Sequence, residues 1–141
     1  HYRMDNYQAS YRLPAGPRTL SIIIDRQHSH PAGWAPPEIA IFMDQHLRGG
    51  PPLPVIAAPS RSGRTVSAEF EAPVQTASAA LVFTSGDPTN HETPWSEAPA
   101  RIDGGLIVTE LPEPEPRAWF LTLTDVRGAT VSTECAGCGG R

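Results

Sequence analysis

Two hydrophobic periodicities divide the chain near residue 52. Before that point, residues 19–26 (Thr-Leu-Ser-Ile-Ile-Ile-Asp-Arg) are almost continuously apolar and β-branched at their centre, which is typical of a strand buried on both faces of a mainly parallel sheet. A short helix capped by Asp5 is expected before this strand, through about Arg12. After it, a Pro-Pro pair suited to a first helical turn and a Gly-Gly pair that ends a helix enclose apolar residues at helical spacing: Ile39, Phe42, Met43 and Leu47.

Beyond residue 52 the period changes to about 2. Apolar and polar residues alternate over 66–71, and further short strand candidates lie at 81–84, 106–109, 119–123 and 130–132. Turn residues such as Asp103-Gly104-Gly105 separate them. We therefore expect an all-β sandwich of immunoglobulin or fibronectin type over residues 53–134, followed by a tail over 135–141. Alternation also predicts that at least one of Trp119 and Phe120 faces the core.

The first 52 residues contain a helix, an apolar strand, a polar loop and an amphipathic helix, but no further strands to complete a parallel sheet. Their apolar surface needs cover from other polypeptide, either covalently attached or held as a partner. The order of elements matches the C-terminal segment of an α/β-hydrolase domain, namely its last strand, histidine loop and C-terminal helix. The absence of an initiator Met or a leader at His1 predicts a processed end or a truncation.

Composition narrows the classes of function. Fifteen acidic and eleven basic side chains give a net charge of −4, and the basic residues are scattered singly, which disfavours nucleic-acid binding. The longest aliphatic run is Ile22-Ile23-Ile24, far short of the roughly 20 apolar residues that cross a bilayer, so no membrane partner is expected. Cell compartment is not indicated.

The two cysteines, Cys135 and Cys138, lie in a Cys-Ala-Gly-Cys sequence beside the C-terminus. Without further cysteines they cannot form a four-thiolate zinc site. A local disulfide, two free thiols and an attachment point for another chain all stay open, and an ordinary frayed tail is the simplest interpretation.

Candidate chemistry centres on His28 and His30, which follow the carboxyl end of the predicted strand. Catalytic groups gather at that edge in open α/β sheets. The α/β-hydrolase triad runs serine, acid, histidine, with the histidine on the loop after the last strand. The alternative is a polar turn whose histidines only form hydrogen bonds. Neither this pair nor the segment Asp87–Glu92 has the ligand set of a metal site, so no metal or cofactor is expected.

Two stretches carry a resemblance to a known family: residues 28–39 (His-Ser-His-Pro-Ala-Gly-Trp-Ala-Pro-Pro-Glu-Ile) and residues 49–54 (Gly-Gly-Pro-Pro-Leu-Pro). Their sequence resembles the C-terminal part of bacterial α/β-hydrolases of the acetylxylan esterase and prolyl-oligopeptidase-like group, which includes dienelactone-hydrolase-like esterases. Residues 121–128 and 131–134 are similar to the β-sandwich appended to such esterases. The resemblance covers most of the chain up to Glu134.

The resemblance implies a serine esterase that acts on carboxylic esters, with acetyl esters of carbohydrates as the expected substrates. It implies that His28 is the triad base, with His30 as second choice. Trp34 is a candidate for substrate binding, although a tryptophan at the start of an amphipathic helix is more often a packing residue. The chain has no Gly-x-Ser-x-Gly, so the nucleophile, the oxyanion hole and the acid are expected on a missing N-terminal α/β-hydrolase region. Asp5 and Asp25 are weak candidates for the acid.

Two other functions stay open. The sandwich could be a non-catalytic module that binds a glycan or a protein, with the first fifty residues serving only to dock it. A prolyl-oligopeptidase-like peptidase is the other alternative, because nothing in the sequence defines an acyl pocket.

Overall fold

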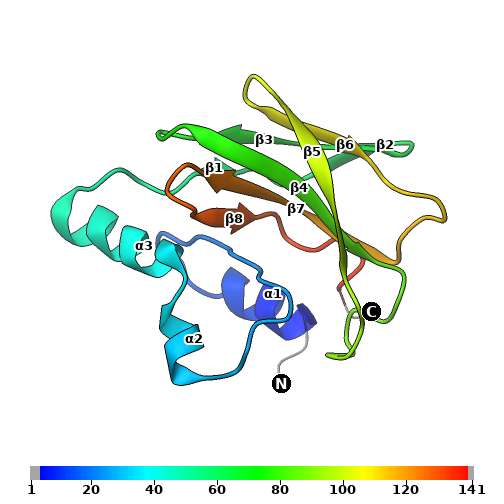
Figure 1. The fold of residues 1–141 in the computed structure, drawn as a ribbon, viewed down its shortest axis with the longest axis horizontal. Coiled ribbons are helices and arrows are strands. Elements are labelled where there is room, and N and C mark those ends of the chain that lie inside the picture. Colours follow the sequence, from blue (N-terminus) through cyan, green and yellow to red (C-terminus); the bar gives the residue numbers. More distant parts are fainter. Residues whose placement is uncertain (1–3, 140–141) are drawn as a thin grey trace.

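An antiparallel β-sheet dominates the computed structural model, which describes residues 4–139 (Figure 1). Its strands are β1 (Val55–Ile56), β2 (Ser60–Ser62), β3 (Thr65–Glu71), β4 (Thr76–Thr84), β5 (Ser96–Asp103), β6 (Leu106–Glu110), β7 (Ala118–Asp125) and β8 (Thr130–Ser132). They pair in the order β1-β3-β6-β5-β4-β7-β8, and β2 pairs separately with β3. The terminal strands β1 and β8 approach each other, so the sheet curls into a nearly closed barrel.

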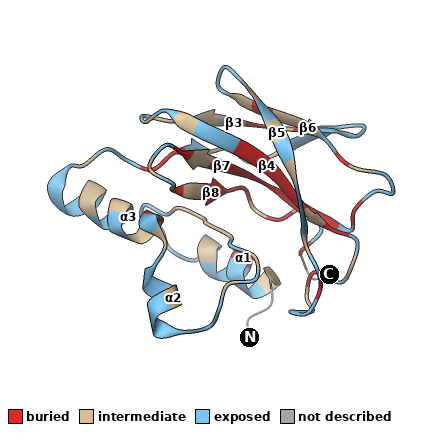
Figure 2. Ribbon diagram, viewed as in Figure 1, coloured by how far each residue is buried: buried red, intermediate tan, exposed pale blue. Residues whose placement is uncertain are grey.

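Strand β7 has both of its faces covered, which explains its almost continuous apolar sequence. Trp119, Leu121 and Leu123 belong to the main core cluster inside the curled sheet, together with Leu81 of β4. Phe120 belongs to a second cluster that contains Val82, Cys135 and Cys138. This division follows from the two-residue period of a strand. The prediction that at least one of Trp119 and Phe120 faces the core is confirmed, because both are buried. Buried residues gather on the strands of the sheet, whereas much of the helical surface is exposed (Figure 2).

The helices lie together on one side of the sheet (Figure 1). They are α1 (Met4–Arg12), α2 (His30–Trp34) and α3 (Pro37–Arg48). Helix α3 confirms the prediction for this segment: it begins within the Pro-Pro pair and ends at Gly49, which has a left-handed φ of 70°. Ile41 and Phe42 pack against the main core cluster.

The predicted α/β-hydrolase segment over residues 1–52 is wrong. Residues 19–26 form no strand of a parallel sheet, and the sheet of this chain is antiparallel throughout. Instead, the segment runs along the edge of β8, where the N–H of Ser132 donates to the carbonyl of Leu20 at 2.8 Å and the N–H of Ile22 donates to Ser132 Oγ at 3.0 Å.

The physical reason is the choice of partners. Within residues 4–139, the edge of β8 offers this segment hydrogen bonds, and the outer face of β7 offers it an apolar surface. Ile22 and Ile24 pack there against the cluster around Phe120. A β-branched run indicates that residues will be buried, but it does not indicate against which element. The antiparallel strands after residue 52 are compatible with the all-β part of the prediction.

Candidate functional site

The histidine loop leads into a short helix that its own sequence caps. Ser29 has an extended backbone, and its Oγ accepts the N–H of Ala32 at 3.3 Å, while the N–H of Gly33 donates to the carbonyl of Ser29 at 2.9 Å. Pro31 stands in the first turn, where its missing donor costs nothing. The sequence predicted only a polar turn here, although Ser-x-Pro is a recognisable helix start.

The proposed catalytic residues surround one open cavity. His28, His30 and Trp34 line it together with Ser29, Gly33 and Ile39, and its volume is about 540 Å³. Both histidines are exposed, and the indole of Trp34 is 66% exposed. The structure therefore brings together the three site residues that the sequence singled out, and it leaves their imidazole and indole groups accessible.

Neither candidate acid lines this cavity. Asp5 lies in α1, where its Oδ1 accepts the N–H of Asn6 at 3.0 Å. Asp25 has a left-handed φ of 54° and lines a different cavity. Ser29, the hydroxyl nearest to the histidines in sequence, is engaged in capping α2. The described residues that line this cavity therefore include accessible imidazoles, but no carboxylate and no serine apart from the capping Ser29.

A second cavity, of about 650 Å³, lies between the sheet and the segment that joins α1 to α3. Its lining includes Ile22, Ile24, Val82 and Trp95 on the apolar side and Asp25, Arg26, Glu38 and Glu97 among its charged groups. Glu38 stands out because it is only 7% exposed, its Oε1 accepts the N–H of Thr130, and its Oε2 has no hydrogen-bond partner within the described part of the chain. The sequence did not mark it, because a glutamate in a first helical turn is ordinary.

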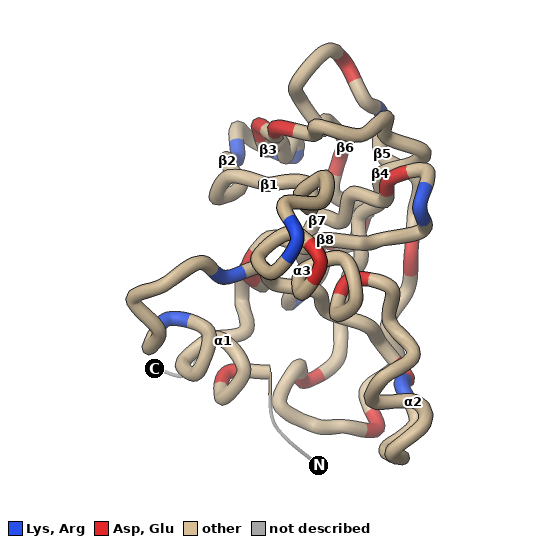
Figure 3. The backbone as a smooth tube through the Cα atoms, turned by 90° about the vertical axis from the view of Figure 1, so that its left-hand side faces the viewer, with Lys and Arg blue, Asp and Glu red and all other residues tan. Residues whose placement is uncertain are grey.

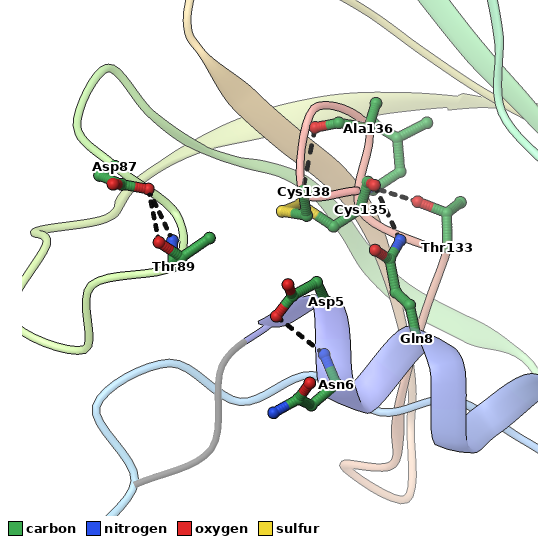
Figure 4. The surroundings of a disulfide bond; sticks show 10 residues. Asp5, Asn6, Gln8, Asp87, Thr89, Thr133, Cys135, Ala136 and Cys138 are labelled. Atoms are coloured by element: carbon green, nitrogen blue, oxygen red, sulfur yellow. Dashed lines mark hydrogen bonds between the residues drawn. A yellow bond between two sulfur atoms is a disulfide. The ribbon is translucent and has the colours of Figure 1, made fainter. Parts of the chain in front are cut away.

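The C-terminal residues hold α1 against the sheet (Figure 4). Cys135 and Cys138 form a disulfide, and both are buried, so of the alternatives left open for these cysteines the local disulfide is the one present. Gln8 Nε2 donates to the carbonyl of Cys135 at 2.8 Å. Arg12 donates to the carboxylate of Glu134, and this hydrogen bond and charge lower the pKa of Glu134.

Charged side chains are spread over the molecule rather than gathered on one face (Figure 3). The segment Asp87–Glu92 forms turns in which Asp87 Oδ1 accepts the N–H of Thr89 and Asn90 Oδ1 accepts the N–H of Glu92, each at 3.0 Å. Among residues 4–139, no group of three or more His, Cys, Asp or Glu side chains is placed to hold a metal ion. No helix in the described part of the chain is long and apolar enough to span a membrane.

Comparison of the chain with protein-family models, with curated proteins and with solved structures finds no match.

Proposed function

We propose that this chain takes part in the hydrolysis of carboxylic esters, with His28 as the general base of a site whose serine nucleophile and oxyanion donors lie on polypeptide outside residues 1–141. The observation that carries the proposal is the cavity in which an accessible imidazole, His28, lies with an accessible indole, Trp34. The resemblance of residues 28–39 to esterase histidine loops supports it.

In this reaction His28 removes the proton from the serine hydroxyl as the serine oxygen attacks the ester carbonyl. The same proton then passes to the departing alkoxide, which leaves as an alcohol, and an acyl-serine remains. Water repeats the sequence with His28 again as base, which releases the acid and restores the serine. Trp34 offers an apolar surface to the acyl group or to the alcohol part of the ester, and an acetyl ester of a carbohydrate is the substrate class that we propose.

The rigid support of the loop suits this role. Ser29 fixes the start of α2 next to His28, and residues 20–24 are held by β8 and by the cluster around Phe120. A base must keep its position relative to the nucleophile within a fraction of an ångström. His28 therefore stands between two anchored segments rather than on a free tail.

The test uses the native complex or the full-length protein that contains this chain, purified from the source cell through an affinity tag at its C-terminus. A fluorophosphonate probe should label a serine in that material, and His28→Ala should lower both the labelling rate and the kcat for an activated acetyl ester by roughly 1,000-fold. His30→Ala should cost on the order of tenfold, if His30 only orients the loop.

His91→Ala is the matched control, because His91 is an exposed histidine in the loop between β4 and β5, and it should leave the rates unchanged. Circular dichroism should show that all three variants are folded. Absence of a labelled serine, or full activity of both His28→Ala and His30→Ala, would overturn the proposal. Loss of activity only in His30→Ala would transfer the role of base to that residue.

A second candidate function is a non-catalytic module that docks onto a partner protein through its helical side. The observation in its favour is the exposed apolar surface of Trp34, Met43 and Leu47, which are 66%, 50% and 75% exposed. Met43 and Leu47 lie one turn apart on α3. If Leu47→Lys abolishes association with the partner while no serine in the complex is labelled, this second function is supported and ester hydrolysis is excluded.

A further inference from the structure

The cavity of about 650 Å³ between the sheet and residues 22–38 is separate from the histidine cavity, and its lining residues point to a ligand class of their own. We propose that it binds an organic cation: an ammonium or guanidinium group carried on a short apolar chain. The proposal does not rest on the role of His28.

The decisive residue is Glu38. Its side chain is more than nine-tenths buried, and only one of its two carboxylate oxygens has a partner: Oε1 accepts the N–H of Thr130, whereas Oε2 accepts nothing from the described residues. A buried carboxylate oxygen without a donor is costly. A cation that enters the cavity would offset the charge of the carboxylate, and it would complete the hydrogen bonds of the buried Oε2 once neighbouring side chains move enough to admit it.

The charges of the lining favour the same class of ligand. Asp25, Glu38 and Glu97 contribute three carboxylates and Arg26 one guanidinium, so the ionised lining carries an excess of two negative charges. Phosphates and carboxylates are disfavoured by this field, whereas an ammonium or guanidinium group is attracted.

The remaining walls suit an apolar chain attached to that group. Ile22, Ile24 and Val82 are lining residues that also belong to the cluster around Phe120. Trp95 lines the cavity with its ring 5.6 Å from that of Phe120, and an indole face attracts cations as well as methylene groups. The volume lies within the range of small-molecule sites, about 300–1,000 Å³. The same chemistry belongs to a free amine and to a lysine or arginine side chain of a peptide.

The experiment is a titration of the ¹⁵N-labelled chain with n-hexylamine and agmatine, followed by NMR. The amide of Thr130 is the natural reporter, because it donates to the carboxylate of Glu38. We expect saturable shifts at Thr130 and at Ile24, and binding of n-hexylamine at least tenfold tighter than that of n-hexanol, its neutral counterpart. The second arm uses Nα-acetyl-lysine amide, which keeps its side-chain ammonium group, and a Gly-Lys-Gly peptide. Tenfold tighter binding of these probes than of n-hexylamine identifies a peptide as the natural ligand, and tenfold tighter binding of n-hexylamine identifies a free amine.

Glu38→Gln keeps the shape of the side chain and removes its charge, so it should weaken binding of n-hexylamine by about tenfold or more. Glu69→Gln is the matched control, because Glu69 is exposed on β3 and does not line the cavity, and it should change the affinity by less than about twofold. Ser96→Trp, at an exposed lining residue of β5, should block the cavity and abolish binding, and it decides the question if Glu38→Gln does not fold.

Four results would overturn the proposal. They are unsaturable shifts at Thr130, equal binding of n-hexanol and n-hexylamine, full affinity in folded Glu38→Gln or Ser96→Trp, and binding of a neutral sugar such as cellobiose in place of the amines. All of these measurements are made without an ester or a nucleophile, so their outcome is distinguishable from that of the esterase test.

Discussion

Replacement of Arg127 by leucine should expose how strongly the turn between β7 and β8 is held. Asp125, whose side chain is fully buried, accepts Arg127 Nε at 2.9 Å and Arg127 Nη2 at 2.6 Å on Oδ2, and it accepts the backbone N–H of Arg127 at 2.8 Å on Oδ1. The guanidinium also donates to the carbonyls of Pro51 and Pro52, each at 2.8 Å. Arg127 therefore ties the segment after α3 to the end of the sheet.

The magnitude follows from what the substitution leaves behind. Arg127→Leu retains an apolar stem but leaves the Asp125 carboxylate in the interior without its counter-ion. Removal of one partner of a buried pair costs about 3–5 kcal/mol. Because Arg127 keeps 23% of its side chain exposed, solvent already screens part of this pair, and we expect the lower part of that range, about 3 kcal/mol.

The assay is equilibrium unfolding in urea, followed by tryptophan fluorescence, to which the buried Trp119 contributes together with Trp34 and Trp95. The control is Arg101→Leu, whose partner Asp103 is 61% exposed while Arg101 itself is 65% exposed, and it should cost less than about 1 kcal/mol. A loss of stability in Arg127→Leu no larger than in Arg101→Leu would refute the view that a buried charge pair holds this turn.

Two further predictions concern contacts at the periphery of the sheet, and a third concerns which part of the chain folds alone. Gly137→Ala should lower the free energy of unfolding by about 2 kcal/mol or more, measured by thermal denaturation, because Gly137 has a φ of 80° and a Cβ there would lie 2.1 Å from the carbonyl oxygen of Arg117. Arg12 lowers the pKa of Glu134 below 4.5, so this pair stabilises the fold above that pH, and the contribution is lost as the pH falls through the lowered pKa; Arg12→Gln should therefore show a smaller loss of stability between pH 7 and pH 3 than the unsubstituted chain. Residues 53–139 expressed alone should fold cooperatively, whereas residues 1–50 alone should show no protected amides at Ile22 and Ile24 in hydrogen exchange, because only the former hold the main core.

Five strands after residue 52 could be predicted from their local pattern, namely β3, β4, β6, β7 and β8, whereas β1, β2 and β5 were not predicted. Alternation of polar and apolar residues in 66–71 records one buried face, and β3 spans Thr65–Glu71 in the structure. Helix α3 was predictable for a similar reason, since its start, its apolar stripe and its stop at Gly49 are all local signals.

The segment 19–26 could not be placed in this way. Its continuous apolar run is also what β7 shows, and such a run predicts burial on two sides. Strand β7 is buried in this way, but in the segment 19–26 Ile23 is 42% exposed and only Ile22 and Ile24 pack against the sheet. The two faces of β7 are covered by the main core and by the cluster around Phe120, whereas Ile22 and Ile24 pack against the outer face of β7 and the disulfide. The candidates His28, His30 and Trp34 could be recognised from the sequence because they lie close together in one loop. The surroundings of Glu38 could not be recognised, because the partner of its Oε1 is Thr130, 92 residues away, and its Oε2 is left without a partner only in the folded chain.

The two proposed sites share one structural support. Residues 25–26 and 35–38 line the Glu38 cavity, and the intervening residues 28–30 and 33–34 line the histidine cavity. At one end this loop continues from Ile22 and Ile24, which are packed beside Phe120, and at the other it enters α3, whose Phe42 contacts the main core. The loop is thus anchored at both ends on the curled sheet, at one end by the cluster around Phe120 and at the other by the main core. This segment holds His28 next to the start of α2 and Glu38 in the first turn of α3, and contacts with the sheet anchor it at both ends.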